Sequence, residues 1–167
     1  MDMVLGKAME DLKQILEGKT LDYRRQTGNF VLAIIPRIAS AGLVALKPEV
    51  KETLKEVGEM FGRRVIAEVI EAEDLESSLK GISKLLEGSR YGRGEVVKVS
   101  KNAAVYRVYE CADCGGMPDV GRSLCGFDEG IIKGVLEKKL GKPVKVDEVE
   151  CWGSGYKHCE FDILIYI

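Results

Sequence analysis

The five cysteines are the residues best suited to chemistry, and all of them lie in the last third of the chain, at Cys111, Cys114, Cys125, Cys151 and Cys159. A structural zinc ion takes four tetrahedral ligands, and thiolate, imidazole and carboxylate groups all serve. Buried free cysteines instead pack as small hydrophobic side chains, and the spacing lacks the second close pair of a zinc finger or ribbon. The spacing alone therefore leaves a metal site and free buried thiols as alternatives.

The expected local structure draws three of these thiols together. Cys151 and Cys159 flank the loop Trp152 to His158, and a hairpin there would bring both thiols to the same end of a sheet. Cys125 shortly precedes a predicted helix, where the backbone dipole favours a thiolate. The residues leave the fourth ligand open, with four candidates: Cys114, Cys111, His158 and Glu148.

The elements that must position these residues follow from apolar periodicity. Helical spacing predicts helices over residues 4–16, 48–69 and 75–86, the last capped by Asp74, and one capped by Asp128 that ends at Gly141. Segments 95–99 and 103–110 indicate a hairpin, and residues 144–150 and 159–167 indicate two more strands. We therefore expect an α+β fold in which several helices pack on a small antiparallel sheet of about four strands. Gly58 and Gly62, one turn apart, predict close contact with a partner helix.

The stretch Phe30 to Leu46 contains a single charge, Arg37, and approaches the length of a bilayer span. Pro36 and Arg37 split it, so we expect two buried elements and no membrane span. A small domain has difficulty covering so long an apolar segment. We therefore expect residues 1–45, an N-terminal helix and this segment, to form the interface of a homodimer.

Length and charge narrow the class of protein. A chain of 167 residues fits one domain, and a net charge of -2 offers no cationic surplus to hold nucleic acid. An odd number of cysteines and the lack of a signal-peptide core predict a cytoplasmic protein with reduced thiols. Gly153-Ser154-Gly155 lacks the third glycine and the following helix of a dinucleotide fingerprint, so no nucleotide cofactor is expected.

The residues around the cysteines resemble the vinyl-4-reductase domain family, of the hydrocarbon-binding-protein type. The similarity lies in Cys125-Gly126-Phe127-Asp128-Glu129-Gly130, in Glu148-Val149-Glu150-Cys151, and in Cys159-Glu160-Phe161 after Gly155. The order of elements extends it over about residues 45–167. The family is similar in fold to transport-particle (TRAPP) subunits and haem nitric-oxide-binding domains, so the resemblance implies an α+β unit enclosing an apolar pocket. The family also occurs as the sensor of aromatic-responsive transcription activators.

In those sensors the matching residues bind zinc, so the resemblance implies a zinc site made of Cys125, Glu148, Cys151 and Cys159. This sequence departs from the pattern at Val149, where the family often has threonine, and at Tyr156, where an acidic residue often follows the glycine. The pair Cys111 and Cys114 is extra, which keeps Cys114 or Cys111 as an alternative fourth ligand, although we favour Glu148.

The hypothesis that follows is a zinc-containing module that binds or senses a small hydrophobic or aromatic ligand. Four aromatic residues are candidates for lining the pocket: Tyr106, Tyr109, Phe127 and Trp152. Two alternatives are a structural or assembly subunit, as the transport-particle resemblance suggests, and a vinyl-group reductase, as the family name suggests. The residues show no hydride-donor site, and four protein ligands leave zinc no open position, so we expect ligand binding without turnover.

Overall fold

The computed structural model describes residues 37–166 together with residues 13, 14, 16 and 17. Most of the helix predicted over residues 4–16, and all of residues 30–36 in the predicted apolar segment, lie outside this part of the chain. Among the described residues, no helix combines the length and the apolar character needed to cross a membrane.

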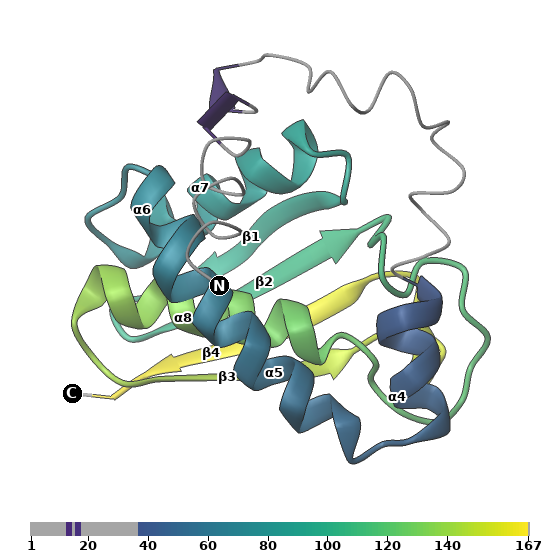
Figure 1. Ribbon diagram of the computed structural model, residues 1–167. Coiled ribbons are helices and arrows are strands. Elements are labelled where there is room, and N and C mark those ends of the chain that lie inside the picture. Colours follow the sequence, from purple (N-terminus) through teal and green to yellow (C-terminus); the bar gives the residue numbers. More distant parts are fainter. Residues whose placement is uncertain (1–12, 15, 18–36, 167) are drawn as a thin grey trace.

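Four antiparallel strands form one open sheet in the order β1-β2-β4-β3 (Figure 1). The strands are β1 Arg93–Val99, β2 Ala103–Tyr109, β3 Val144–Glu150 and β4 Cys159–Ile165. Along β4, Cys159, Phe161, Ile163 and Ile165 are buried, and the residues between them are half-buried or exposed. This period of two means that one face of the sheet meets the core and the other meets solvent. The predicted α+β fold, with a small antiparallel sheet, is confirmed.

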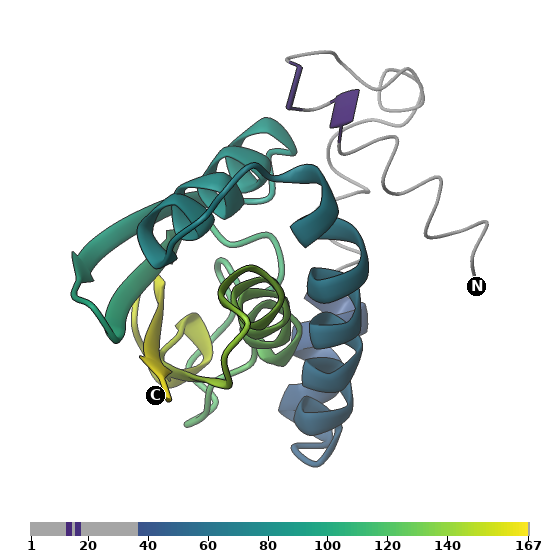
Figure 2. The same cartoon turned by 90° about the vertical axis from the view of Figure 1, so that its left-hand side faces the viewer.

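The helices form two layers on the covered face. α7 (Leu75–Gly88) packs on β1, and α8 (Gly126–Leu140) packs on β3. α5 (Val50–Phe61) continues through a π-helical turn, Gly62–Ile66, into α6 (Ala67–Val69) and packs on α8. Figure 2 shows α8 lying between the sheet and α5. The chain before α5 forms a π-helical turn, Arg37–Gly42, and the short helix α4 (Leu43–Leu46).

Glycines set the distance between α5 and α8. A Cβ atom at Gly58 would overlap the carbonyl oxygen of Phe127, and one at Gly62 would overlap that of Ile131. The contact is reciprocal, because a Cβ atom at Gly130 would overlap the carbonyl oxygen of Lys55. The partner helix predicted from Gly58 and Gly62 is therefore α8, and the two backbones touch with no side chain between them.

Two predicted helix caps have different outcomes. Asp74 does cap α7, because its Oδ1 accepts a hydrogen bond of 2.7 Å from the backbone N–H of Ser77. The prediction that Asp128 caps the next helix was wrong: α8 begins at Gly126, with Cys125 at the N-cap position. Asp128 lies inside the first turn, and its side chain points into the protein, where it is 6% exposed. The helix ends as predicted at Gly141, which has a φ of 63°.

The described part of the apolar stretch, residues 37–46, contributes to the core of its own chain. Ala41 and Val44 are buried, whereas Leu46 is 83% exposed. The predicted homodimer stays a prediction.

Candidate metal centre and adjoining cavity

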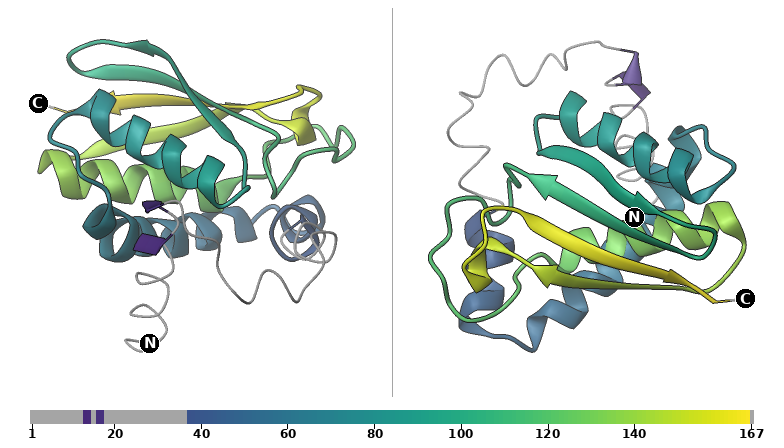
Figure 3. Two further views of the ribbon diagram at one scale, coloured as in Figure 1. Left: turned by 90° about the horizontal axis from the view of Figure 1, so that it is seen from above. Right: turned by 180° about the vertical axis from the view of Figure 1, so that it is seen from behind.

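The fold gathers all five cysteines at one end of the sheet. Cys111 and Cys114 lie in the loop after β2, Cys125 precedes α8, and Cys151 and Cys159 lie on either side of the connection between β3 and β4. Because β2 and β3 end where β4 begins, antiparallel pairing brings these segments together, as the right-hand view of Figure 3 shows. All five side chains are 0% exposed.

The distances between the sulfur atoms suit a tetrahedral metal ion. Cys125 Sγ lies 3.6 Å from Cys159 Sγ and 3.8 Å from Cys111 Sγ, and Cys114 Sγ lies 3.2 Å from Cys159 Sγ. Metal–sulfur bonds of about 2.3 Å in a tetrahedral site place the sulfurs about 3.8 Å apart. All five cysteines are free thiols, so none is withdrawn from a metal by a disulfide.

Two sets of four ligand atoms can be drawn from this cluster, each with all its atoms within 4.8 Å of one another. The first set contains only thiols, from Cys111, Cys114, Cys125 and Cys159. The second set is the one implied by the family resemblance, Cys125, Glu148, Cys151 and Cys159. The structure therefore brings together every cysteine considered from the sequence, and the two sets share two of their members.

Glu148 faces the cluster because it follows Val144 and Val146 on the buried face of β3. Its Oε2 atom accepts a 2.9 Å hydrogen bond from the backbone N–H of Cys125 and lies 3.4 Å from Lys51 Nζ. Its Oε1 atom is buried and has no hydrogen-bond partner. Burial, followed by the charge of Cys151, raises the pKa of Glu148 to about 8. An unpartnered carboxylate oxygen beside three thiols is a suitable donor atom for a metal ion.

When no cation is bound, the thiols of the cluster differ in how readily they lose their protons. Hydrogen bonds from Cys114, Cys125 and Cys159 lower the pKa of the Cys151 thiol. The pKa of Cys125 is instead raised well above its ordinary value, first by its hydrogen bond with Cys111. Thiolates at these distances repel one another, so the metal-free site confines its negative charge to few sulfurs. Metal binding would then release protons from the others.

His158, a candidate ligand from the sequence, lies with the half-buried carboxylates of Glu150 and Glu160 and outside both sets. Its Nε2 atom is 2.7 Å from an oxygen of Glu150, and its ring packs at 5.6 Å from the ring of Tyr109. The single histidine is thus no part of the cysteine cluster.

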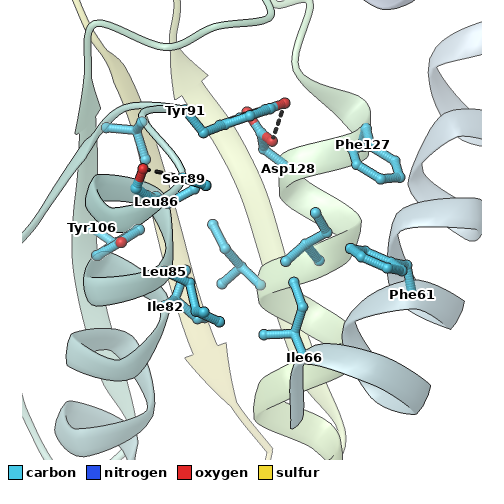
Figure 4. A pocket seen from close by; sticks show the side chains of 13 residues that line it. Phe61, Ile66, Ile82, Leu85, Leu86, Ser89, Tyr91, Tyr106, Phe127 and Asp128 are labelled. Carbon is cyan, nitrogen blue, oxygen red and sulfur yellow. Dashed lines mark hydrogen bonds between the residues drawn. The ribbon is translucent and has the colours of Figure 1, made fainter. Parts of the chain in front are cut away.

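An apolar cavity of about 170 Å³ lies between α7, α8, β2 and the end of α5 (Figure 4). Its walls are mostly aliphatic and aromatic, from Phe61, Ile66, Ile82, Leu85, Leu86, Ser89, Tyr91, Tyr106, Val108, Phe127, Asp128, Ile131 and Ile132. An engineered apolar cavity of about 150 Å³ binds benzene. This cavity therefore has room for a molecule with a single ring.

Asp128 joins the cavity to the cysteine cluster. Its Oδ1 atom accepts a 3.1 Å hydrogen bond from the hydroxyl of Tyr91, which also lines the cavity. Its Oδ2 atom lies 3.5 Å from Cys111 Sγ. Burial, with the nearby charge of Cys111, raises the pKa of Asp128 well above its ordinary value. A single side chain thus contacts both the first ligand set and the space that a ligand would occupy.

The structure places two of the four aromatic candidates at the cavity and two elsewhere. Tyr106 and Phe127 line it. Tyr109 packs against His158, and Trp152 lies in the turn between β3 and β4, so neither is among the lining residues. Sequence reasoning did not find Asp128, which resembles an ordinary helix cap. It also did not find Tyr91, whose loop carries no periodic signal.

Comparison with known proteins identifies a matching domain and a relative of similar length. Residues 104–165 match the V4R domain. An uncharacterized protein from Methanocaldococcus jannaschii is 29% identical over 164 residues, which is 98% of this chain and 92% of the relative.

Three solved structures share the fold. A vinyl-4-reductase family protein from M. jannaschii has a TM-score of 0.57 at 20% identity, over 99% of this chain and 94% of the other. The phenol-responsive sensory domain of the transcription activator PoxR, solved with phenol, has a TM-score of 0.60 at 16% identity, over 83% and 75%. Trafficking protein particle complex subunit 3 from Naegleria fowleri, covalently bound to palmitic acid, has a TM-score of 0.64 at 16% identity, over 84% and 98%.

Proposed function

We propose that this chain, whose residues 104–165 match the V4R domain, is a zinc-containing module that binds or senses a small hydrophobic or aromatic molecule. The observation that carries the proposal is the apolar cavity whose wall includes Asp128, a residue that also contacts the cysteine cluster. A ligand in the cavity would therefore meet a group that also contacts Cys111 of the cysteine cluster.

The size and lining of the cavity favour a monocyclic ligand with at most one polar group. A volume of about 170 Å³ suits a single ring, rather than the long chain of palmitic acid. The Tyr91 hydroxyl and the Asp128 carboxyl group, which are joined by a hydrogen bond, lie together at one end of an otherwise mostly apolar lining (Figure 4). A phenolic hydroxyl placed at this end would find both a donor and an acceptor. The phenol bound to the PoxR sensory domain, which shares the fold, supports this ligand class.

The residues of the second set fit a zinc ion. Cys125, Cys151 and Cys159 are buried thiols, and Glu148 offers a buried oxygen, Oε1, that has no hydrogen-bond partner. When bound, zinc would supply a closed tetrahedral cross-link between α8, β3 and β4, with no open position for a substrate. Lys51 and the Cys125 N–H hold the other carboxylate oxygen of Glu148 and so orient it. This arrangement favours a structural role for the metal over a reductase centre.

Movement of α8 is the expected output of ligand binding. Tyr91, Phe127 and Asp128 contact the ligand space at the start of this helix. Because α8 meets α5 and the turn after it backbone to backbone at Gly58 and Gly62, no side chain lies between the two segments at these points to absorb a displacement. A ligand that favours one position of α8 would therefore also move α5, on the outside of the helical layer, where a partner protein could detect the change.

A thermal-shift screen of the zinc-loaded chain tests the proposal, with phenol, toluene and cyclohexanol as first probes. A ligand that binds only the folded state adds about 2.7 kcal/mol of stability at a hundredfold excess over Kd, so a clear rise in Tm is expected. Tyr91→Phe should reduce the preference for phenol over toluene. Tyr106→Phe is the matched control, because its hydroxyl also borders the cavity but pairs with Ser83 Oγ at 2.9 Å.

Two results would overturn this function. No stabilisation by any apolar or aromatic probe would favour an assembly subunit, for which the fold shared with the trafficking complex subunit is the supporting observation. Conversion of a bound probe, at a rate that scales with protein and is lost in Cys125→Ser, would make the protein an enzyme.

A further inference from the structure

We propose that the cysteine cluster holds two zinc ions, with the thiolates of Cys125 and Cys159 bridging them. Cys111 and Cys114 would complete the first site, and Cys151 and Glu148 the second. This inference extends the zinc centre of the proposed function by one ion and depends on the residues that the family resemblance leaves unassigned.

The overlap of the two ligand sets is the first observation behind this proposal. Each set has four donor atoms within 4.8 Å of one another, which is the number that a tetrahedral ion needs. The sets share Cys125 and Cys159 and differ in the other two ligands. Two tetrahedra that share one edge have this composition, and the shared sulfurs lie 3.6 Å apart, close to the tetrahedral edge of about 3.8 Å.

The loop that carries Cys111 and Cys114 is built to aim both thiols inward. Glu110, directly before it, has a φ of 53°, a left-handed conformation that is unfavourable for a residue with a side chain. The next turn is closed by a 2.8 Å hydrogen bond from the Gly115 N–H to the Cys111 carbonyl. Between the two cysteines, Asp113 is buried and accepts a 2.9 Å hydrogen bond from Ser40 Oγ. The loop is thus held by a backbone hydrogen bond and by the side chain of Asp113 at its centre.

Charge compensation allows a second ion. The five thiolates and Glu148 would carry six negative charges, all on atoms of buried residues. One divalent ion would leave two of these charges without a counter-charge if two thiols stay protonated, and two ions would leave the same two with every thiol deprotonated. The remaining charge would face Lys51, which lies 3.4 Å from Glu148, and the N-terminus of α8 at Cys125.

Metal analysis of the full chain, purified without chelator, tests the proposal directly. Native mass spectrometry and elemental analysis should find two zinc ions per chain. Cys114→Ser removes a ligand of the first site only, and Cys151→Ser removes a ligand of the second site only, so each should reduce the content to one. These two variants are matched controls for each other, because both side chains are 0% exposed.

A cadmium titration of the metal-free wild type keeps the test independent of how the variants fold. Thiolate-to-metal absorption should rise until two equivalents have been added, and two ¹¹³Cd resonances should show coupling through the bridging sulfurs. A break at one equivalent, or one zinc per chain that Cys114→Ser leaves in place, would overturn the second ion while the proposed function stands. Iron with visible absorption, in place of zinc, would overturn both zinc sites without affecting the ligand screen.

Discussion

Replacing Glu148 with glutamine in the metal-free protein should change how stability depends on pH. Glu148 is a buried carboxyl group whose pKa rises from 4.5 to about 8, because burial and the neighbouring Cys151 outweigh Lys51. In the unfolded chain the same carboxyl group is exposed to water and has its ordinary pKa. The folded state therefore holds a proton that the unfolded state gives up at a lower pH.

The sign and size of the effect follow from this difference. A raised pKa in the folded state gives a stability contribution that is fully present below pH 4.5 and is lost as the pH rises toward 8. Each tenfold change in proton affinity is worth about 1.4 kcal/mol, which sets a ceiling of about 5 kcal/mol on the whole effect. Between about pH 5.5 and pH 8 the free energy of unfolding of the wild type should fall by about 3 kcal/mol more than that of Glu148→Gln.

Urea unfolding with chelator and a phosphine reductant, measured at both pH values, gives this difference as a change in the free energy of unfolding. Glu150→Gln is the control, because Glu150 is on the same strand but half-buried and paired with His158. With zinc bound the trend should reverse, since the metal needs its ligands deprotonated. Equal pH dependence of the metal-free wild type and Glu148→Gln would refute the reasoning.

Three further predictions concern the cavity, the helix contact and the oligomer. Leu85→Ala should enlarge the cavity, so that two-ring aromatics such as naphthalene raise Tm more than single-ring probes do. Leu79→Ala, at a buried position on the same helix but outside the cavity lining, should keep the wild-type order of probes. Each variant should lower the free energy of unfolding by about 2–5 kcal/mol. Gly130→Ala should lower the free energy of unfolding by at least about 2 kcal/mol in urea titrations, because its Cβ atom would overlap the backbone of Lys55; a loss below about 0.5 kcal/mol would contradict the backbone contact. Light scattering at micromolar concentration should report a dimer. A monomer would contradict the predicted interface over residues 1–45.

Those parts of the fold that depend on neighbouring residues could be predicted from the sequence. The alternation of Cys159, Phe161 and Ile163 marks a half-buried strand without any knowledge of its partners. Gly58 and Gly62 indicate a close helix, but the sequence does not say which one. That the partner helix is α8 is seen only from the reciprocal contact of Gly130 with Lys55, two residues far apart in the chain.

The candidate site divides in the same way. Cys125, Cys151 and Cys159 could be grouped in advance, because a hairpin and a helix start are local features. The position of Cys111 and Cys114 depends on a loop held by the bond between Asp113 and Ser40, 73 residues apart, so no local pattern predicts it. The cavity could not be located from the sequence. Periodicity predicts which side chains point inward, but it does not predict where their packing leaves a space.

The packing of α5 and the charge balance of the site are connected through one side chain. Lys51 lies on α5, and its Nζ atom reaches Ser123 Oγ at 2.6 Å, Glu129 at 3.0 Å and Glu148 at 3.4 Å. It can do so because the glycine contacts bring the backbone of α5 against α8. A displacement of α8 by a ligand would thus alter the distance between this cation and the carboxylate of Glu148, the proposed metal ligand. The helix contact would then couple the cavity to the metal centre by electrostatics, in addition to the direct contact of Asp128 with Cys111.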